Sequence, residues 1–220
     1  MLAHFTALAL AFASVPPAEE EGGAEREPPA LDVLAARLES SDPAVRDDAA
    51  ERLARHDDAR DVWKAVEEML RSDSADTRRA TIRVVRKLRI EEADAAVARL
   101  LRKDPDAKVR RDASHALAEV APRKAVSRLR SAALYDDEVI VRRAAIQDLG
   151  RLGSLDAART LCDLLEEAIV DEDAYFSTLA QRSLTLATGQ TFGTNLEGWR
   201  HWIESRETVP TDVFVTPDRP

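Results

Sequence analysis

The chain contains few of the residues from which metal centres and disulfides are made. Its 220 residues include one cysteine, Cys162, and four histidines. A single cysteine excludes an internal disulfide and a cysteine-based zinc site. None of the histidines stands in an H-x-x-x-H or H-x-H pair, as the ligands of many zinc sites do. We therefore predict no metal site and no cofactor, and we interpret Cys162, in the stretch TLCDLLEEA, as a small buried apolar residue.

Short motifs of catalysis are missing as well. The seven glycines form no Gly-rich phosphate loop, and no serine stands in a G-x-S-x-G motif. The many carboxylates fall at expected helix caps and on expected solvent-facing surfaces, where runs of charge are usually just surface. The sequence therefore predicts no catalytic residues, and we interpret the protein as a non-enzyme.

Aromatic residues are scarce, and so is any excess of basic ones. Aromatics make up 5% of the chain and hydrophobic residues 45%, so the core must consist mainly of Ala, Leu and Val. Together with abundant Arg and Glu, this composition is typical of an all-α protein. The formal net charge of −9 argues against nucleic acid as a partner, because a general nucleic-acid binder needs a strong basic excess.

The first 18 residues differ from the rest of the chain. An apolar run from Leu2 to Val15 contains no Asp, Glu, Lys or Arg and stops at Pro16-Pro17. It is too short to span a bilayer, which takes about 20 residues. With the small residues around Ala13 it resembles a secretory signal peptide. We therefore expect residues 1–18 to direct export, to the periplasm or out of the cell, with a short buried or anchoring helix as the alternative.

Two further segments have the composition of unfolded chain. Residues 19–30 are rich in Glu, Gly and Pro and have no apolar face, so burial cannot offset the entropy of ordering them. Residues 208–220 carry several prolines. The sequence predicts an acidic disordered linker at residues 19–30 and a flexible tail at residues 208–220.

Between these ends one phrase recurs every 32 residues. A Val-Arg or Thr-Arg pair is followed, four and eight positions after its first member, by a small and then an apolar residue. The pairs are Val45-Arg46, Thr77-Arg78, Val109-Arg110 and Val141-Arg142; the small residues are Ala49, Thr81, Ala113 and Ala145; the apolar residues are Leu53, Val85, Leu117 and Leu149. A fixed period in this range predicts stacked supersecondary units. The i, i+4, i+8 spacing predicts one buried helical stripe.

Each unit divides into two helices. In the second unit, residues 61–70 have apolar side chains on one helical face, and residues 77–88 carry the repeated phrase. Turns of Asp, Ser and Pro separate the paired helices, and these residues favour helix N-termini. A fifth, degenerate unit at residues 155–187 has Ser177 in place of the arginine, as terminal capping repeats are often atypical.

The pattern D-P-x-V-R-x-x-A-x-x-x-L resembles HEAT repeats, and among them the short repeats described as phycobilisome-lyase HEAT-like. The resemblance covers residues 31–187 and implies a right-handed α-solenoid of about five helical hairpins. Residues 188–207 resemble the "TGQ-x-FG…W-x-x-W" segment that follows HEAT-like arrays in some bacterial extracytoplasmic proteins. We expect a capping loop and a helix from about Leu196 to Arg206, with Trp199 and Trp202 forming a hydrophobic lid. An aromatic ligand site is the alternative for this pair.

Arginines of the second helices fall into two sets. The repeated Arg46, Arg78, Arg110 and Arg142 form a structural ladder by resemblance, because in HEAT-like repeats this arginine bonds turn carboxylates and carbonyls. The candidate partners are Asp42, Asp73, Asp76, Asp104, Asp106 and Asp137. A second set lies beside the ladder on what this architecture makes a concave face, and the helix at residues 77–90 has no acidic residue. We predict a partner-binding patch there, with a plain solvated surface as the alternative, at Arg79, Arg83, Arg86, Arg111, His115, Arg143 and Gln147.

These observations favour a non-enzymatic scaffold that binds a protein partner, which the basic patch suggests to be acidic. We expect a monomer. The resemblance also leaves room for a bilin lyase-like enzyme, or another enzyme or enzyme subunit on a HEAT scaffold. A DNA-repair enzyme on such a scaffold is a weaker alternative, because export and net acidity count against it.

Overall fold

The structure is a computed structural model, and it describes residues 30–207. The expected signal segment at residues 1–18 and the expected tail at 208–220 lie outside this range. So does the expected acidic linker, except for Ala30, which precedes the first helix. Within the described range the chain is helical and has no β-strand.

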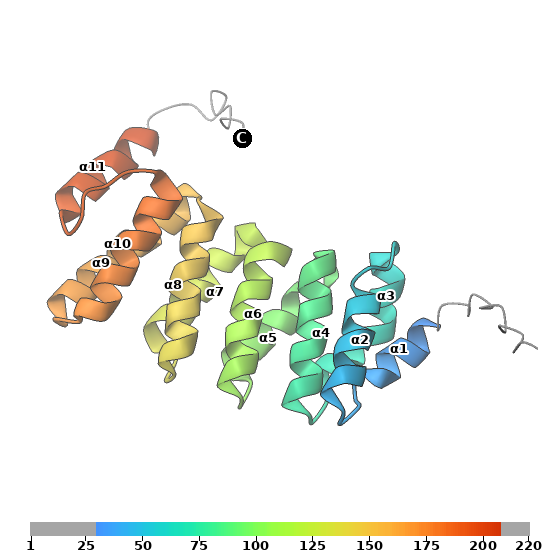
Figure 1. Ribbon diagram of the computed structural model, residues 1–220. Helices are drawn as coiled ribbons and strands as arrows, with labels where there is room; N and C mark the ends of the chain where they lie inside the picture. The colour runs from blue at the N-terminus through green and yellow to red at the C-terminus, as the bar shows by residue number, and fades with distance from the viewer. Residues whose placement is uncertain (1–29, 208–220) are drawn as a thin grey trace, which may run out of the picture.

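Five helical pairs follow one another along the chain, and a final helix closes the array (Figure 1). The first members of the pairs, which we call the first-helix layer, are α1 (Leu31–Arg37), α3 (Ala59–Val66), α5 (Asp94–Lys103), α7 (Pro122–Tyr135) and α9 (Leu155–Val170). The second members, the second-helix layer, are α2 (Pro43–Leu53), α4 (Ala75–Leu88), α6 (Ala107–Val120), α8 (Val139–Leu152) and α10 (Ala174–Thr188). Short 3-10 turns, η1 (Glu67–Arg71) and η2 (Glu91–Ala93), extend α3 and precede α5. The predicted all-α solenoid of about five hairpins is confirmed.

Helix starts follow from the turn residues. The side chains of Asp42, Ser74 and Asp106 accept backbone N–H groups at the N-termini of α2, α4 and α6, and Pro43 occupies the first turn of α2. These contacts satisfy amide groups that a helix end leaves without a partner. Asp42 and Asp106, predicted as arginine partners, therefore act as helix caps.

The predicted stripe forms the core between the layers. Its small and apolar positions are buried in all four repeats, from Ala49 and Leu53 to Ala145 and Leu149. The position before the repeated arginine is also buried in the second repeat, at Thr77. The Thr77 hydroxyl donates to the Leu38 carbonyl of the preceding pair at 3.0 Å. Val45 is 38% exposed, so its predicted burial is wrong. This position packs against the preceding pair, and no described helix precedes α1.

The repeated arginines link each repeat to the next. Arg78 Nε and Nη2 donate to the two carboxylate oxygens of Asp104 at 2.7 and 2.8 Å, while its Nη1 donates to the Ser72 carbonyl at 2.8 Å. Arg110 pairs in the same way with Asp136, with both distances 2.8 Å. Arg110 Nη1 also donates to the carbonyl of Asp104, at 2.9 Å. Each aspartate therefore accepts from two successive arginines, through its carboxylate and through its main chain.

The two outer arginines are held differently. Arg46 donates to the Ser40 carbonyl at 2.6 Å and reaches Asp76 only at 3.4 Å. Arg142 donates to the carbonyls of Asp136 and Asp137, and its guanidinium stacks over the Phe176 ring at 5.0 Å from the ring centre. Of the partners proposed from sequence, Asp76 and Asp104 use their carboxylates and Asp73 and Asp137 their carbonyls. Asp136 was not among them.

A C-terminal helix, α11 (Leu196–Glu207), packs against α9 and ends the stack. Trp199 is fully buried, donates its indole N–H to the Gly193 carbonyl at 2.9 Å, and packs edge-on against Phe192. Trp202 is half-buried and stacks with Arg206. The two tryptophans thus pack at the end of the core, the arrangement expected of a lid.

We expect Arg78→Ala to lower the free energy of unfolding by about 3–5 kcal/mol, because it leaves the buried Asp104 carboxylate without its partner. Arg46→Ala is the matched control and should cost less, since Asp76 is exposed. Urea denaturation followed by circular dichroism measures both. Equal midpoints for the two variants would contradict a structural role specific to the paired arginines.

Trp199→Ala should destabilise the array by about 3–5 kcal/mol, the usual cost of truncating a large buried aromatic side chain. Trp202→Ala removes a similar ring that is only half-buried, so its cost should be clearly smaller. Thermal melts and binding of a dye that reports exposed apolar surface would separate the two. Similar melting temperatures for both variants would show that α11 does not close the core through Trp199.

Candidate functional site

The residues predicted to bind a partner lie on three neighbouring helices of the second-helix layer. Arg79, Arg83 and Arg86 are on α4, Arg111 and His115 on α6, and Arg143 and Gln147 on α8. The 32-residue period places them at matching positions of consecutive helices, which run side by side in Figure 1. We call this surface the α4–α6–α8 face.

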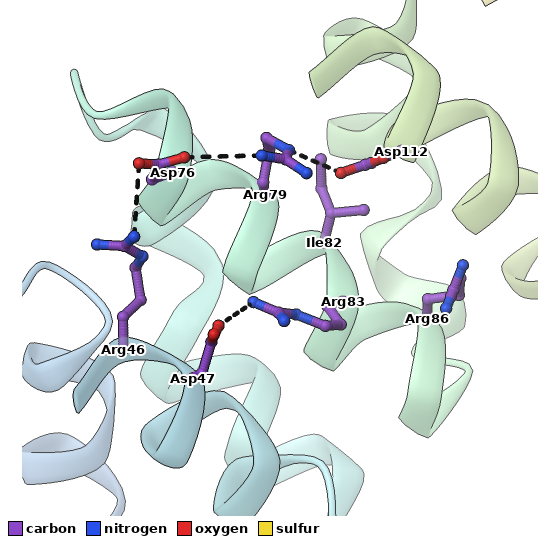
Figure 2. Close-up of a pocket in the computed structure, with 8 residues that line it drawn as sticks. All are labelled: Arg46, Asp47, Asp76, Arg79, Ile82, Arg83, Arg86 and Asp112. Carbon is purple, nitrogen blue, oxygen red and sulfur yellow. Dashed lines mark hydrogen bonds and ion pairs between the residues drawn. The ribbon is translucent and has the colours of Figure 1, made fainter. Parts of the chain in front are cut away.

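Most of the arginines on this face already have carboxylate partners from neighbouring helices (Figure 2). Arg79 Nε is 2.8 Å from an oxygen of Asp112 on α6, and Arg83 is 2.7 Å from Asp47 on α2. Helix α4 itself begins at Ala75 and so includes Asp76, which lies 3.7 Å from Arg79. The expectation of a helix without acidic residues, and hence of an unbalanced basic patch, is wrong.

A hollow of about 350 Å³ lies among these ion pairs. Charged side chains of α2, α4 and α6 form its walls, and Ile82 is its one apolar lining residue (Figure 2). It is lined by Arg46, Asp47, Asp76, Arg79, Ile82, Arg83, Arg86 and Asp112. Because most of its charges are paired with one another, this hollow presents alternating positive and negative groups.

A second hollow of about 320 Å³ adjoins the first and extends the face towards α8. It is lined by Arg86, His115, Ala118, Glu119, Asp148, Arg151 and Leu152. Arg86 lines both hollows, and its nearest carboxylate, on Glu119, is 3.8 Å away. Arg86 therefore stands where the hollows meet and has a weaker partner than Arg79 or Arg83.

The remaining residues of the predicted patch differ in their surroundings. Arg111 pairs with Asp112 at 2.6 Å, so Asp112 is shared between Arg79 and Arg111. The side chains of Arg143, which is exposed, and Gln147, which is half-buried, have no polar partner within residues 30–207. Arg143 is thus a free cation at the α8 end of the face, as far as the described residues go.

A buried carboxylate that was not predicted lies behind the second hollow. Asp148 is 1% exposed and accepts from the Ser114 hydroxyl at 2.7 Å, from Arg151 at 2.7 Å, and contacts His115 Nδ1 at 2.9 Å. Ser114 is itself fully buried. Three partners on two helices hold this carboxylate in place, and it fixes the His115 ring at the edge of the hollow.

Comparison of the repeats with one another could have found this cluster. Ser114 stands at the position of Ile82 and Ile146 in the adjacent repeats, and Asp148 at the position of Val84 and Ala116. All these positions are buried. A polar residue at a buried position needs a partner. Ser114 and Asp148 lie on neighbouring helices of the second-helix layer, so the repeat pattern predicts that these two polar side chains contact each other.

Because the cluster contains a serine, a histidine and an aspartate, we compared its hydrogen bonds with those of a catalytic triad. A catalytic serine donates its hydroxyl to the histidine and faces a space that a substrate can enter. Here the Ser114 hydroxyl donates to Asp148, and Ser114 is 0% exposed. The connectivity is that of a buried carboxylate with two supporting donors, and it does not activate the serine.

Within residues 30–207, neither the cysteine nor the carboxylates and histidines form a reactive or metal-binding site. Cys162 is buried in α9, and burial raises the pKa of its thiol, which keeps the sulfur protonated and unreactive. Among residues 30–207 no group of three or more His, Cys, Asp or Glu side chains could hold a metal ion. None of the helices in this range has the length and apolar character needed to cross a bilayer.

The helical pairs and the arginine links can now be compared with known proteins. Residues 93–184 match the family model of HEAT repeats. The matched segment covers the third and fourth pairs and most of the fifth, and the first two pairs carry the same 32-residue phrase. The match supports HEAT repeats in general and does not extend to the phycobilisome-lyase subset. No curated protein matches the chain.

Asp148→Ala should lower the free energy of unfolding by about 3 kcal/mol. One charge-assisted hydrogen bond contributes roughly 1.5–3 kcal/mol, and the buried Ser114 hydroxyl would be left without an acceptor. The double variant Ser114→Ile/Asp148→Ala restores the apolar residue types of the neighbouring repeats, and it should regain at least half of the loss. Urea titrations measure both. A double variant no more stable than Asp148→Ala would contradict this account of the cluster.

Proposed function

We propose that the protein is a non-enzymatic scaffold that binds a segment of a partner protein across the α4–α6–α8 face. The main observation in support of this proposal is that two hollows adjoin on this face and share the lining residue Arg86. A surface that extends over several repeats can hold an elongated partner segment, and solenoids commonly bind partners in this way. The HEAT-repeat match supports the same class of function.

The charges of the face suggest what the partner presents to it. Arg79 and Arg83 have close carboxylate partners, so a ligand would have to displace Asp112 or Asp47 to bind them. Arg86 and Arg143 are more available, because the first has only a 3.8 Å contact and the second none in the described chain. We infer that partner carboxylates bind Arg86 and Arg143, while apolar or polar groups fill the hollows between them.

The scaffold proposal does not use the Ser114–Asp148–His115 cluster as catalytic machinery, since the Ser114 hydroxyl donates to Asp148 and not to His115. Its contribution is to position the His115 ring at the wall of the second hollow. Export is part of the proposal and depends on the apolar run at residues 2–15. A monomeric state is proposed as well.

Charge reversal at Arg86 tests the proposed surface. A photo-reactive amino acid at Ala118, inside the second hollow, would cross-link a bound partner and allow it to be identified. With that partner purified, Arg86→Glu should weaken binding by about tenfold, or about 1.4 kcal/mol. Lys87→Glu is the matched control, because Lys87 is next to Arg86, is exposed and lines neither hollow. It should leave the affinity nearly unchanged.

The fold should survive the Arg86 variant, since an ion pair between partly exposed side chains contributes little to stability. Circular dichroism melts check this point. If Arg86→Glu and Lys87→Glu weaken the partner equally, or neither does, the α4–α6–α8 face is not the binding surface.

A further inference from the structure

A second surface, on the first-helix layer, is strongly basic. Helix α7 carries four basic residues and no acidic one, and α5 carries three basic residues and one acidic. These seven basic residues and one acidic residue give the two helices a formal charge of +6, in a chain whose total is −9. In Figure 1 the two helices lie behind the second-helix layer, α5 between α4 and α6 and α7 between α6 and α8.

Few of these cations are neutralised. Asp94, the one acidic residue, pairs with Arg128 and, at 3.2 Å, with Lys124. Arg130 has a long contact with Asp163 at 3.9 Å. The others have no ion pair and no side-chain hydrogen bond with any residue in the described part of the chain; they are Arg99, Arg102, Lys103 and Arg123. Compared with the α4–α6–α8 face, this surface leaves more positive charge unpaired.

Two of the unpaired arginines, Arg99 and Arg102, border a groove. Between α5 and α7, which contact each other little, lies a hollow of about 580 Å³, larger than either hollow on the second-helix layer. Small side chains form much of its lining: Ala95, Ala98, Ser127, Ser131 and Ala132. Small residues let another backbone approach closely, so the groove can accept an extended or helical segment.

Arginine and tyrosine side chains complete the groove. Arg99 and Arg102 line it from α5, and Tyr135 at the end of α7 is 76% exposed. Exposed arginine and tyrosine are the residues that most often contribute strongly to binding at protein interfaces. Asp136 also lines the groove, but its carboxylate is bound to Arg110.

We propose that the α5–α7 groove is a docking site for an acidic segment of a partner protein. In the complex, carboxylates of that segment pair with Arg99 and Arg102, and an apolar side chain packs on the Tyr135 ring. Charge complementarity selects this occupant, because a groove lined by Arg99 and Arg102, which have no carboxylate partner among the described residues, attracts a short acidic segment at close range. A long polyanion would extend past the groove on to the acidic remainder of the surface. The proposal is independent of the α4–α6–α8 face.

Short synthetic peptides provide the probe. The test peptide alternates Glu and Ala around one central Phe; one control replaces Phe with Ala, and another replaces every Glu with Lys. Fluorescence anisotropy at low salt should show binding of the acidic Phe peptide, weaker binding of its Ala version and none of the Lys peptide. Raising the salt should weaken binding, since exposed charges are screened over about 8–10 Å.

Variants assign the binding to the groove. Arg99→Glu/Arg102→Glu should weaken the acidic Phe peptide by at least about tenfold, and Tyr135→Ala should reduce the advantage of the Phe peptide over its Ala version. The matched control is Arg37→Glu/Arg60→Glu, which makes the same charge change at two exposed arginines of α1 and α3 that also lack side-chain partners in the described range. It should bind like the unaltered protein.

Three results would overturn the proposal. The acidic Phe peptide fails to bind, or the Arg99/Arg102 and Arg37/Arg60 double variants weaken it equally. Alternatively, an oligothymidine or phosphatidylserine vesicles bind more tightly than the peptide and lose that binding in the Arg99/Arg102 variant. The last result would assign the groove to nucleic acid or to membrane. Arg99, Arg102 and Tyr135 are exposed, and their side chains have no polar partner within residues 30–207, so melts should show that each variant folds.

Discussion

The fold depends on an arginine of one repeat that pairs with an aspartate at the turn of the next. Arg78 bonds both carboxylate oxygens of Asp104, and Arg110 does the same with Asp136. Since buried charge is tolerated only where it is paired and hydrogen-bonded, each repeat needs its neighbour for more than apolar contact. At the outer end Arg142 contacts the Phe176 ring, and the ionic series stops there.

Periodicity predicted the part of the structure that repeats. It identified five helical pairs and the buried stripe, because equivalent positions in a solenoid have equivalent surroundings. The ladder role of the repeated arginines was implied by the resemblance to HEAT repeats. The reasoning from equivalent positions failed for Val45, since the first repeat has no described neighbour on one side. It also failed for the charge balance of α4, where Arg83 meets Asp47 and Arg79 meets Asp112. Counting the charges of α4 alone leaves out the carboxylates of the helices on either side of it.

The features that bear most on function are departures from the repeat. Ser114 and Asp148 replace apolar residues at buried positions and bond to each other. Helices α5 and α7 together carry seven basic residues and one acidic residue, and four of these cations have no carboxylate partner among the described residues. The sequence does not show which cations are paired, because ion-pair partners such as Arg128 and Asp94 come from different repeats.

The double use of each turn aspartate restricts how the length of this protein can change. Asp104 is 26 residues after the arginine that its carboxylate binds and six before the arginine that its carbonyl binds. These two steps fill one 32-residue period. An insertion within either step would move one arginine out of reach of that aspartate, while the duplication or loss of a whole unit would keep both contacts. The array is therefore suited to lengthen or shorten by entire repeats, and gene segments that encode one unit are the natural modules for such change.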